Sequence, residues 1–217
     1  MGLSNREEAE RTRTRVIDAA LSLFSRRGYG HTSLEMIANE LGMTRGAIYG
    51  HFKNKLDLYT QLMQLSQTPL YDIMEDALRD DGPPLEVLRR FMDQWFDLLE
   101  NNPRHRASFE ILLNKTELTE ELSDYLESEY SLTQSMVDGM AELLGRAVKQ
   151  RDLPRKADVG FHALAAYNIL MGVTHTWLFN PRLFAITEMG SRMTEQFFGS
   201  LPQPTPASSP RKRALAS

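Results

Sequence analysis

A short stretch of the chain, residues 33–52, holds the residues whose types and spacing could do chemistry. Ser33 and Thr44 each precede a short run with helical apolar spacing, where a hydroxyl can cap the first turn. Gly42 lies between the two runs and can adopt the left-handed backbone that a tight turn requires. The stretch therefore has the dimensions of a helix-turn-helix, a motif whose second helix enters the major groove of DNA.

The outward side of this predicted motif is nearly free of acidic residues. The apolar positions that would form a small core with the preceding helix are Ile37, Leu41, Ile48 and Phe52. The residues left on the outside are Thr44, Arg45, Gly46, Tyr49 and Gly50. Because phosphates repel carboxylates and attract basic groups, such a surface suits a DNA duplex.

The distribution of charge points in the same direction. Residues 1–55 contain nine basic and six acidic residues, a net charge of +3, whereas the rest of the chain carries a net charge of −7. A basic N-terminal part on an acidic body indicates that only the first part meets a polyanion. A solvated surface without a partner would show the same charge, so this alternative stays open.

Nearly every long segment shows helical spacing of apolar residues, and no segment alternates with the period of a strand. The pattern predicts an all-α fold of about nine helices. We expect a three-helix helix-turn-helix domain over residues 1–55 and a helical body over residues 56–200. Residues 201–217 contain four prolines and no core-forming pattern, which predicts a disordered tail.

One helix of the body is expected to be buried on most sides. Residues 159–181 contain no Asp, Glu, Lys or Arg, and the length alone would allow a membrane span. The polar side chains of His162, Asn168 and His175 would be costly in hydrocarbon, so no membrane partner is predicted. We expect this helix, with another near residues 185–198, to form the interface of a homodimer.

The sequence carries no pattern typical of an enzyme. There is no cysteine, and the five histidines form no i, i+4 pair with a carboxylate cluster, so no metal site is predicted. Gly28-Tyr29-Gly30 lacks the third glycine and the preceding strand of a dinucleotide loop, and no cofactor is predicted. The lack of cysteine and of an apolar leader in the first 25 residues predicts a cytoplasmic protein.

The run TRGAIYGHFKNKLDL, from Thr44 to Leu58, resembles the recognition-helix signature of the TetR family of bacterial transcriptional regulators. Residues 109–117, FEILLNKTE, and residues 177–179, WLF, resemble the AcrR-like branch, whose members repress multidrug efflux pumps. Gly50 departs from that branch, where tryptophan is usual. The matching positions before the run are Gly28, Thr32-Ser33-Leu34, Ile37-Ala38 and Leu41-Gly42.

This resemblance implies a ligand-responsive repressor that binds a palindromic operator in double-stranded DNA as a homodimer. It also implies control of an efflux pump operon and release from DNA by small hydrophobic or cationic aromatic drugs. The implied major-groove residues are Thr44, Arg45, Gly46 and Tyr49, with Arg45 the candidate for a guanine edge. The implied phosphate contacts are Thr32, Ser33, His51 and Lys55.

The resemblance further implies a ligand cavity in the body. Methionines and aromatic residues are frequent there and suit an adaptable apolar cavity, although ordinary core packing explains each of them as well. The candidate ligand-binding residues are Met63, Gln67, Trp95, Phe109, Glu110, Met140, Asn168, Met171 and Trp177. The alternative is a small-molecule-binding or scaffold protein with a non-functional helix-turn-helix.

Overall fold

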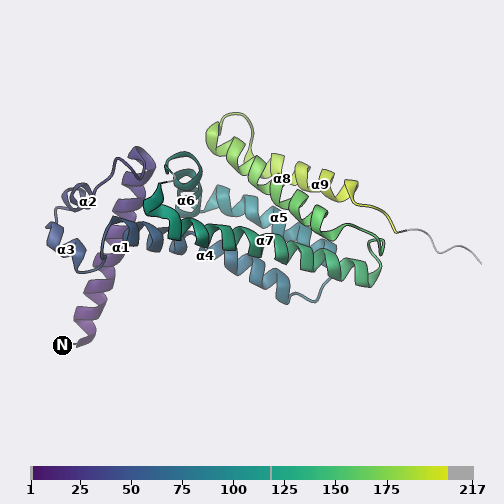
Figure 1. Ribbon diagram of the computed structural model, residues 1–217, viewed down its shortest axis with the longest axis horizontal. Helices are drawn as coiled ribbons and strands as arrows, with labels where there is room; N and C mark the ends of the chain where they lie inside the picture. The colour runs from purple at the N-terminus through teal and green to yellow at the C-terminus, as the bar shows by residue number, and fades with distance from the viewer. Residues whose placement is uncertain (1, 118, 205–217) are drawn as a thin grey trace, which may run out of the picture.

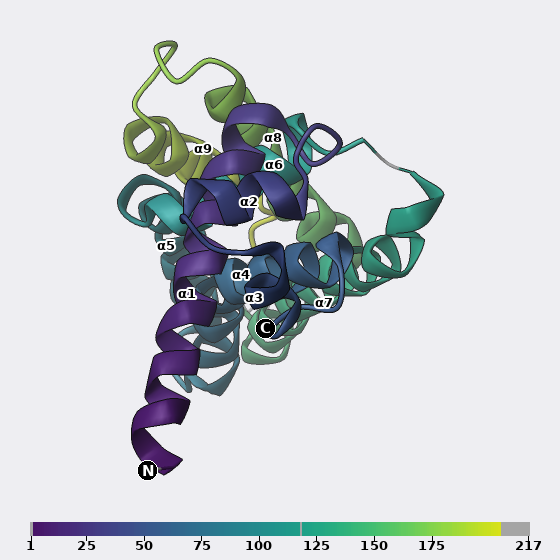
Figure 2. The ribbon, with the colours of Figure 1, turned by 90° about the vertical axis from the view of Figure 1, so that its left-hand side faces the viewer.

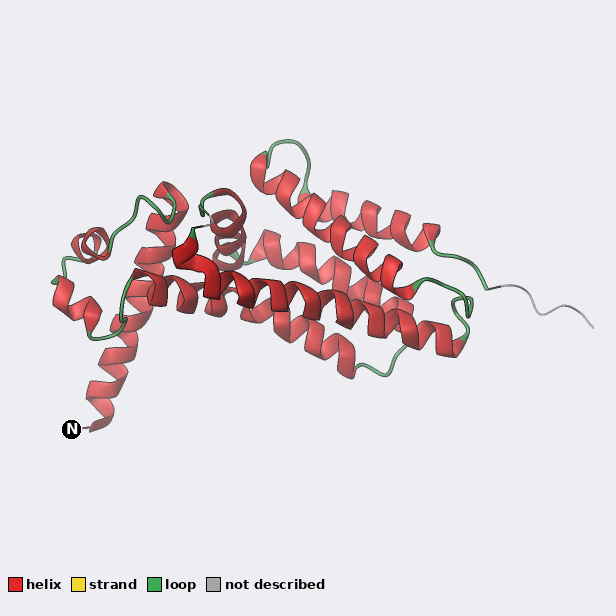
Figure 3. Cartoon of the chain, in the orientation of Figure 1, coloured by secondary structure: helices red, strands yellow, loops and turns green. Residues whose placement is uncertain are grey.

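The structure, a computed structural model, describes residues 2–117 and 119–204 (Figure 1). All regular elements in this part of the chain are helical, which confirms the predicted all-α class (Figure 3). The helices are α1 (Gly2–Arg27), α2 (Leu34–Glu40), α3 (Arg45–Tyr49), α4 (Lys55–Arg79), α5 (Pro84–Asn101), α6 (Pro103–Asn114), the 3-10 turn η1 (Glu120–Leu122), α7 (Ser123–Gln150), α8 (Val159–Phe179) and α9 (Ile186–Ser200).

Capping side chains set where the short N-terminal helices begin. The hydroxyl of Ser33 accepts a hydrogen bond from the backbone N–H of Met36 (3.2 Å) at the start of α2. The hydroxyl of Thr44 accepts one from Ala47 (3.3 Å) at the start of α3. Gly42, with φ of +64°, makes the turn between them. These local signals produce the predicted helix-turn-helix.

The described residues form two hydrophobic cores, and α4 belongs to both. Leu58 and Leu62, in the first turns of α4, are buried with α1, α2 and α3 at one end of the molecule. Leu70 and Met74, further along α4, are buried in the second core, within the body of α4–α9. The domain boundary that we place after residue 55 is therefore the start of a helix that both parts share (Figure 1).

The body packs its long helices closely. Helix α5 contacts α7, α8 and α9, and α8 contacts α7 and α9. Gly190 in α9 leaves space for the ring of Phe96 in α5, because a Cβ at this position would lie only 2.3 Å from a ring atom. Leu201 is buried in the same core. Its assignment to the tail is therefore wrong, and residues 205–217 of the predicted tail lie outside the described residues.

Helix α8 has one buried face and one exposed apolar face. Ala163, Ala166 and Leu170 are fully buried against the body, whereas 64% of Phe161 and 50% of Leu164 are exposed. In the part of the chain that the structure describes, no helix has the length and apolar character that crossing a membrane requires. The charge-free sequence of α8 thus reflects packing on one side and an uncovered apolar surface on the other.

Candidate DNA interface and ligand cavity

Helices α2 and α3 lie at the end of the molecule that faces the viewer in Figure 2, away from the body. Ile48 and Phe52 point into the N-terminal core, with 0% and 1% of their surface exposed. The opposite side of α3 carries Arg45, which is exposed, and Tyr49, of which 43% is exposed. The shortest helix of the N-terminal part therefore presents a basic and an aromatic side chain to solvent.

Arg45 and Tyr49 form a pre-arranged pair, one turn apart on α3. The guanidinium Nη2 donates to the Tyr49 hydroxyl at 2.8 Å, and the guanidinium carbon lies 5.2 Å from the centre of the tyrosine ring. This hydrogen bond to the Tyr49 hydroxyl raises the pKa of Arg45, whose guanidinium is charged at any physiological pH. The planar guanidinium group of Arg45 is therefore held in one position while most of its N–H donors stay free. Contact with the edge of a guanine requires such free donors.

A groove of about 260 Å³ brings several of the predicted DNA-binding residues together. Ser33 at the start of α2, the Arg45–Tyr49 pair on α3 and Lys55 at the start of α4 all line it. Lys55 Nζ donates to the backbone carbonyl of Tyr29 at 3.1 Å and lies 4.0 Å from the centre of its ring. Two of the three ammonium donors thus stay available to a phosphate.

Other predicted DNA-binding residues are placed differently. Thr32 also borders the groove, but its side chain is buried and its hydroxyl donates to the carbonyl of Gly28 at 2.9 Å. In this structure its hydroxyl is therefore not free to donate to a phosphate. Gly46 lies on α3 beside Arg45, and half-exposed His51 follows α3 outside this groove.

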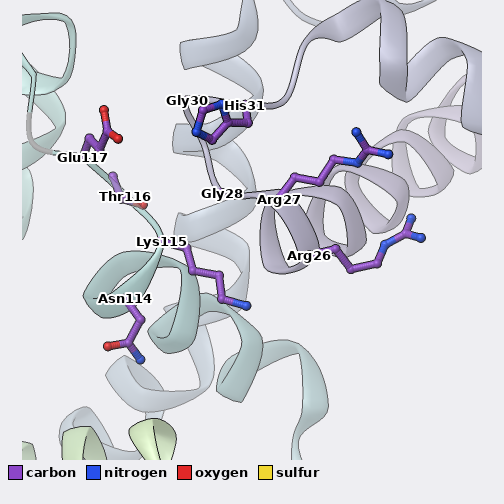
Figure 4. A pocket seen from close by; sticks show the side chains of 9 residues that line it. All are labelled: Arg26, Arg27, Gly28, Gly30, His31, Asn114, Lys115, Thr116 and Glu117. Carbon is purple, nitrogen blue, oxygen red and sulfur yellow. The ribbon is translucent and has the colours of Figure 1, made fainter.

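The two parts of the molecule are joined at the end of α1. The backbone N–H of Tyr29 donates to the carbonyl of Lys115, after α6, at 3.0 Å. Lys115 in turn pairs with Glu110 at 2.7 Å and donates to the carbonyl of Ser25. Figure 4 shows the hollow beside this joint, with Gly28 close to Lys115. Glu110 therefore contributes to the junction, and it lines a surface hollow with Arg106 and Trp177.

A column of three tyrosines crosses the same junction. The ring centres of Tyr29 and Tyr59 lie 4.8 Å apart, and those of Tyr59 and Tyr125 lie 5.1 Å apart, both pairs edge to face. Burial raises the pKa of Tyr59 to about 12, so the column is uncharged at neutral pH. The column therefore connects Tyr125 on α7 of the body with Tyr29, whose backbone carbonyl accepts the hydrogen bond from Lys55.

The body contains a cavity of about 180 Å³ between α4, α5, α6, α7 and α8. Trp95 forms much of its aromatic wall, with Phe109 at 5.7 Å and Tyr167 at 6.4 Å between ring centres. The indole N–H of Trp95 donates to the hydroxyl of Thr174 at 2.9 Å, so it needs no ligand. The cavity is lined mainly by apolar and aromatic groups, as small-molecule sites commonly are.

Four of the nine predicted ligand-binding residues line this cavity: Gln67, Trp95, Phe109 and Met171. Met63 is buried in the N-terminal core and Met140 in the body core. Asn168 borders a separate surface hollow between α8 and α9, and Trp177 borders another with Arg106 and Glu110. These four residues therefore do not line the 180 Å³ cavity, because helical spacing shows that a residue points inward but not into which space.

Sequence reasoning missed several cavity residues, of which Glu129 on α7 is chemically the most distinct. Its Oε2 accepts a long hydrogen bond of 3.5 Å from Nε2 of Gln67, and burial raises the pKa of its carboxyl. The residues on either side of it at helical spacing, Tyr125, Leu132 and Met136, are apolar or aromatic. This spacing was the available signal that Glu129 faces inward.

Comparison with known proteins agrees with this architecture. Residues 16–62 match the family model of bacterial regulatory proteins of the tetR family, and residues 83–201 match that of the C-terminal region of MAATS-type transcriptional repressors. The chain is 31% identical to the regulator AcrR of Shigella flexneri, over 85% of this chain and 86% of that protein. It is 33% identical to TtgR of Pseudomonas putida, over 81% and 84%.

Solved structures give the same result for the fold. The chain superposes on NalD, the secondary repressor of the MexAB-OprM multidrug efflux pump in Pseudomonas aeruginosa, with a TM-score of 0.80 and 30% identity, over 90% of this chain and 98% of that one. It superposes on SmeT in complex with triclosan with a TM-score of 0.76 and 27% identity, over 90% and 99%. This chain is therefore a member of the TetR family of bacterial transcriptional regulators, and not an enzyme.

Proposed function

We propose that this chain is a drug-responsive repressor that binds an inverted-repeat operator as a homodimer in the cytoplasm and controls an efflux pump operon. The observation that carries the proposal is the course of α4. This single helix begins with Lys55 in the groove beside α3 and continues to Gln67 in the body cavity. Both sites therefore contact one rigid element, which is the physical requirement for a ligand to influence DNA binding.

The DNA-reading part of the proposal rests on α3. One helix of five residues contacts too few bases to find one site in a genome, so two copies must read two half-sites. In such a dimer, the recognition helices must lie about one DNA turn apart, roughly 34–36 Å. A ligand that favours a body conformation with a different spacing would release the operator.

The proposed dimer uses the exposed faces of α8 and α9. Leu170 in α8 and Phe197 in the last turn of α9 are buried in the chain's own core and cannot form the interface. The hollow between α8 and α9, of about 450 Å³, is lined by apolar groups that a second copy would cover. Gly172 lies in this hollow and is exposed.

Two glycines allow a matched test of this interface. A Cβ at Gly172 in α8, or at Gly145 in α7, would meet no other atom within 4 Å. Gly172→Asp therefore adds a charge to the proposed interface without a clash inside the monomer, and we expect it to sediment as a monomer that has lost operator affinity. Gly145→Asp, the control, should stay dimeric. A dimeric Gly172→Asp variant would place the interface elsewhere.

The function itself is tested by selecting DNA from a pool of random duplexes with the full chain. We expect an enriched inverted repeat that also occurs at an efflux pump promoter, and release of the bound repeat when triclosan or a dye is added. Triclosan is a reasonable first probe because the related SmeT is solved in complex with it. The absence of any enriched sequence would favour the alternative, a small-molecule-binding protein with a non-functional helix-turn-helix.

A further inference from the structure

A chain of side-chain hydrogen bonds joins α1 to the segment between α3 and α4, residues 50–54. The backbone N–H of Lys53 donates to Oδ2 of Asp57, in the first turn of α4, at 2.8 Å. The other carboxylate oxygen, Oδ1, accepts from Nε2 of Gln61 at 2.8 Å. The amide oxygen of Gln61 accepts in turn from the guanidinium Nη2 of Arg13 on α1. We call Arg13, Gln61 and Asp57 the α1–α4 clamp.

The clamp has one favourable arrangement. Reversing the amide of Gln61 would turn its oxygen toward the carboxylate of Asp57 and its NH₂ group toward the guanidinium of Arg13, so its orientation is fixed. Burial raises the pKa of the Asp57 carboxyl, but the hydrogen bonds from Lys53 and Gln61 and the charges of Lys53 and Arg13 lower it further. Asp57 is therefore charged at neutral pH and accepts both hydrogen bonds.

The guanidinium of Arg13 is engaged inside the protein. Only 27% of the Arg13 side chain is exposed, and besides Gln61 it pairs with Glu10 at 3.5 Å. Its guanidinium carbon also lies 5.8 Å from the ring centre of Phe52, which is buried in the N-terminal core. Arg13 does not line the groove that contains Arg45. These contacts indicate a role within the protein and not at a phosphate.

Capping of α4 does not explain the outer half of the clamp. The side chain of Asn54 accepts from the backbone N–H of Asp57 at 2.8 Å, and Asp57 accepts from Lys53. These two hydrogen bonds already satisfy the start of the helix. Gln61 and Arg13 add a link between α4 and a helix that lies 48 positions earlier in the chain.

We infer that Arg13 is a positioning residue for operator recognition, which acts through Gln61 and Asp57. Helix α3 has five residues, too few to keep its orientation without support from the segments at its ends. The clamp holds the segment after α3 and thereby the angle at which α3 presents Arg45 to a base. The inference rests on the proposed function, because it concerns α3 in the proposed operator complex.

The experiment uses the full chain with Arg13→Met, Gln61→Met and the double variant. Arg155→Met is the control for the lost charge, because Arg155 is exposed in the loop between α7 and α8. Affinities for the selected operator and for an unrelated duplex are measured by fluorescence anisotropy over a range of salt concentrations. Thermal unfolding shows that each variant is folded at the temperature of the assay.

We expect each single variant to bind the operator about tenfold more weakly and the unrelated duplex within about twofold of the wild type. Unrelated DNA is held mainly through its phosphates, which a misaligned α3 affects less. The double variant should be no weaker than the single ones, because either change already breaks the clamp. The slope of log affinity against log salt concentration should stay the same, and Arg155→Met should change nothing.

Three results would overturn this role of Arg13. The first is operator binding by Arg13→Met that equals the wild type. The second is a salt slope shallower by about 1.8 in Arg13→Met with no effect of Gln61→Met, which would make Arg13 a phosphate contact in each subunit. The third is an equal loss on both duplexes. Each of these leaves the proposed function intact, whereas a wild type that selects no operator refutes the proposed function and this inference with it.

Discussion

Lys55 offers a quantitative test of how the protein holds DNA. A lysine in the first turn of a helix is disfavoured by the helix dipole, so its position at the start of α4 calls for another stabilising role. Its ammonium is fixed by the carbonyl of Tyr29 at 3.1 Å and by the ring of the same residue at 4.0 Å. It is therefore pre-ordered in the groove that also contains Arg45.

We expect Lys55→Met to bind all duplexes more weakly and with less dependence on salt. Each neutralised phosphate contributes about 0.9 to the slope of log affinity against log salt concentration. A dimer that loses one contact in each subunit should therefore have a slope that is shallower by about 1.8. Methionine keeps most of the packing against Tyr29, so the effect reports mainly the lost charge.

The assay is fluorescence anisotropy of labelled operator and of an unrelated duplex over a range of salt concentrations. Lys149→Met is the matched control, because Lys149 is an exposed lysine at the far end of α7 from α3 (Figure 1). Thermal unfolding of each variant shows whether the junction at Tyr29 is intact. An unchanged slope in Lys55→Met, or a loss confined to the operator, would refute the phosphate contact.

Three further predictions concern α3, the packing of the body and the response to pH. Arg45→Ala should cost about 1–3 kcal/mol per half-site and relax specificity at one base pair, which binding to single-base operator variants measures; equal losses on every duplex would contradict base reading. Gly190→Ala should destabilise the fold by about 1–3 kcal/mol or more in urea unfolding, because the new methyl group overlaps the ring of Phe96. The control Gly145→Ala should stabilise the fold by up to about 1 kcal/mol. Similar effects of the two substitutions would show that α5 and α9 are not closely packed at Gly190. Burial lowers the pKa of His105, whose Nδ1 lies 2.8 Å from the carbonyl oxygen of Ser66. The unfolded chain therefore binds the proton more readily, and the free energy of unfolding should fall as the pH drops below about 6.5. His105→Gln should lose less stability over that range, and an identical loss would exclude this histidine as the cause.

The N-terminal part could be predicted from the sequence because its signals are local. Ser33, Thr44 and Gly42 fix the ends of α2 and the start of α3 through caps and one left-handed turn within a few residues of each other. Helix α8 lies within the charge-free stretch of residues 159–181, and it begins at Val159 because the side chain of Asp158 caps its first turn. Such contacts do not depend on how distant helices pack.

The ligand cavity could be predicted only in part, because its walls come from five helices that are distant in the chain. Met63 and Gln67 are one turn apart on α4, yet the first is buried in the N-terminal core and the second lines the cavity. Helical spacing places both on an inward face, and only tertiary packing separates them. Glu129 was missed because a glutamate is normally placed on a solvated face.

The central claim, that a ligand in the body cavity and an operator at α3 compete through α4, is tested most directly by measuring their coupling from both sides. The measurement uses a hydrophobic or cationic ligand already selected for binding to the free protein. Operator affinity is determined with and without saturating ligand, and ligand affinity with and without saturating operator. We predict that each weakens the other by the same factor, about 5- to 150-fold. A ligand that binds tightly while operator affinity stays the same would contradict the account.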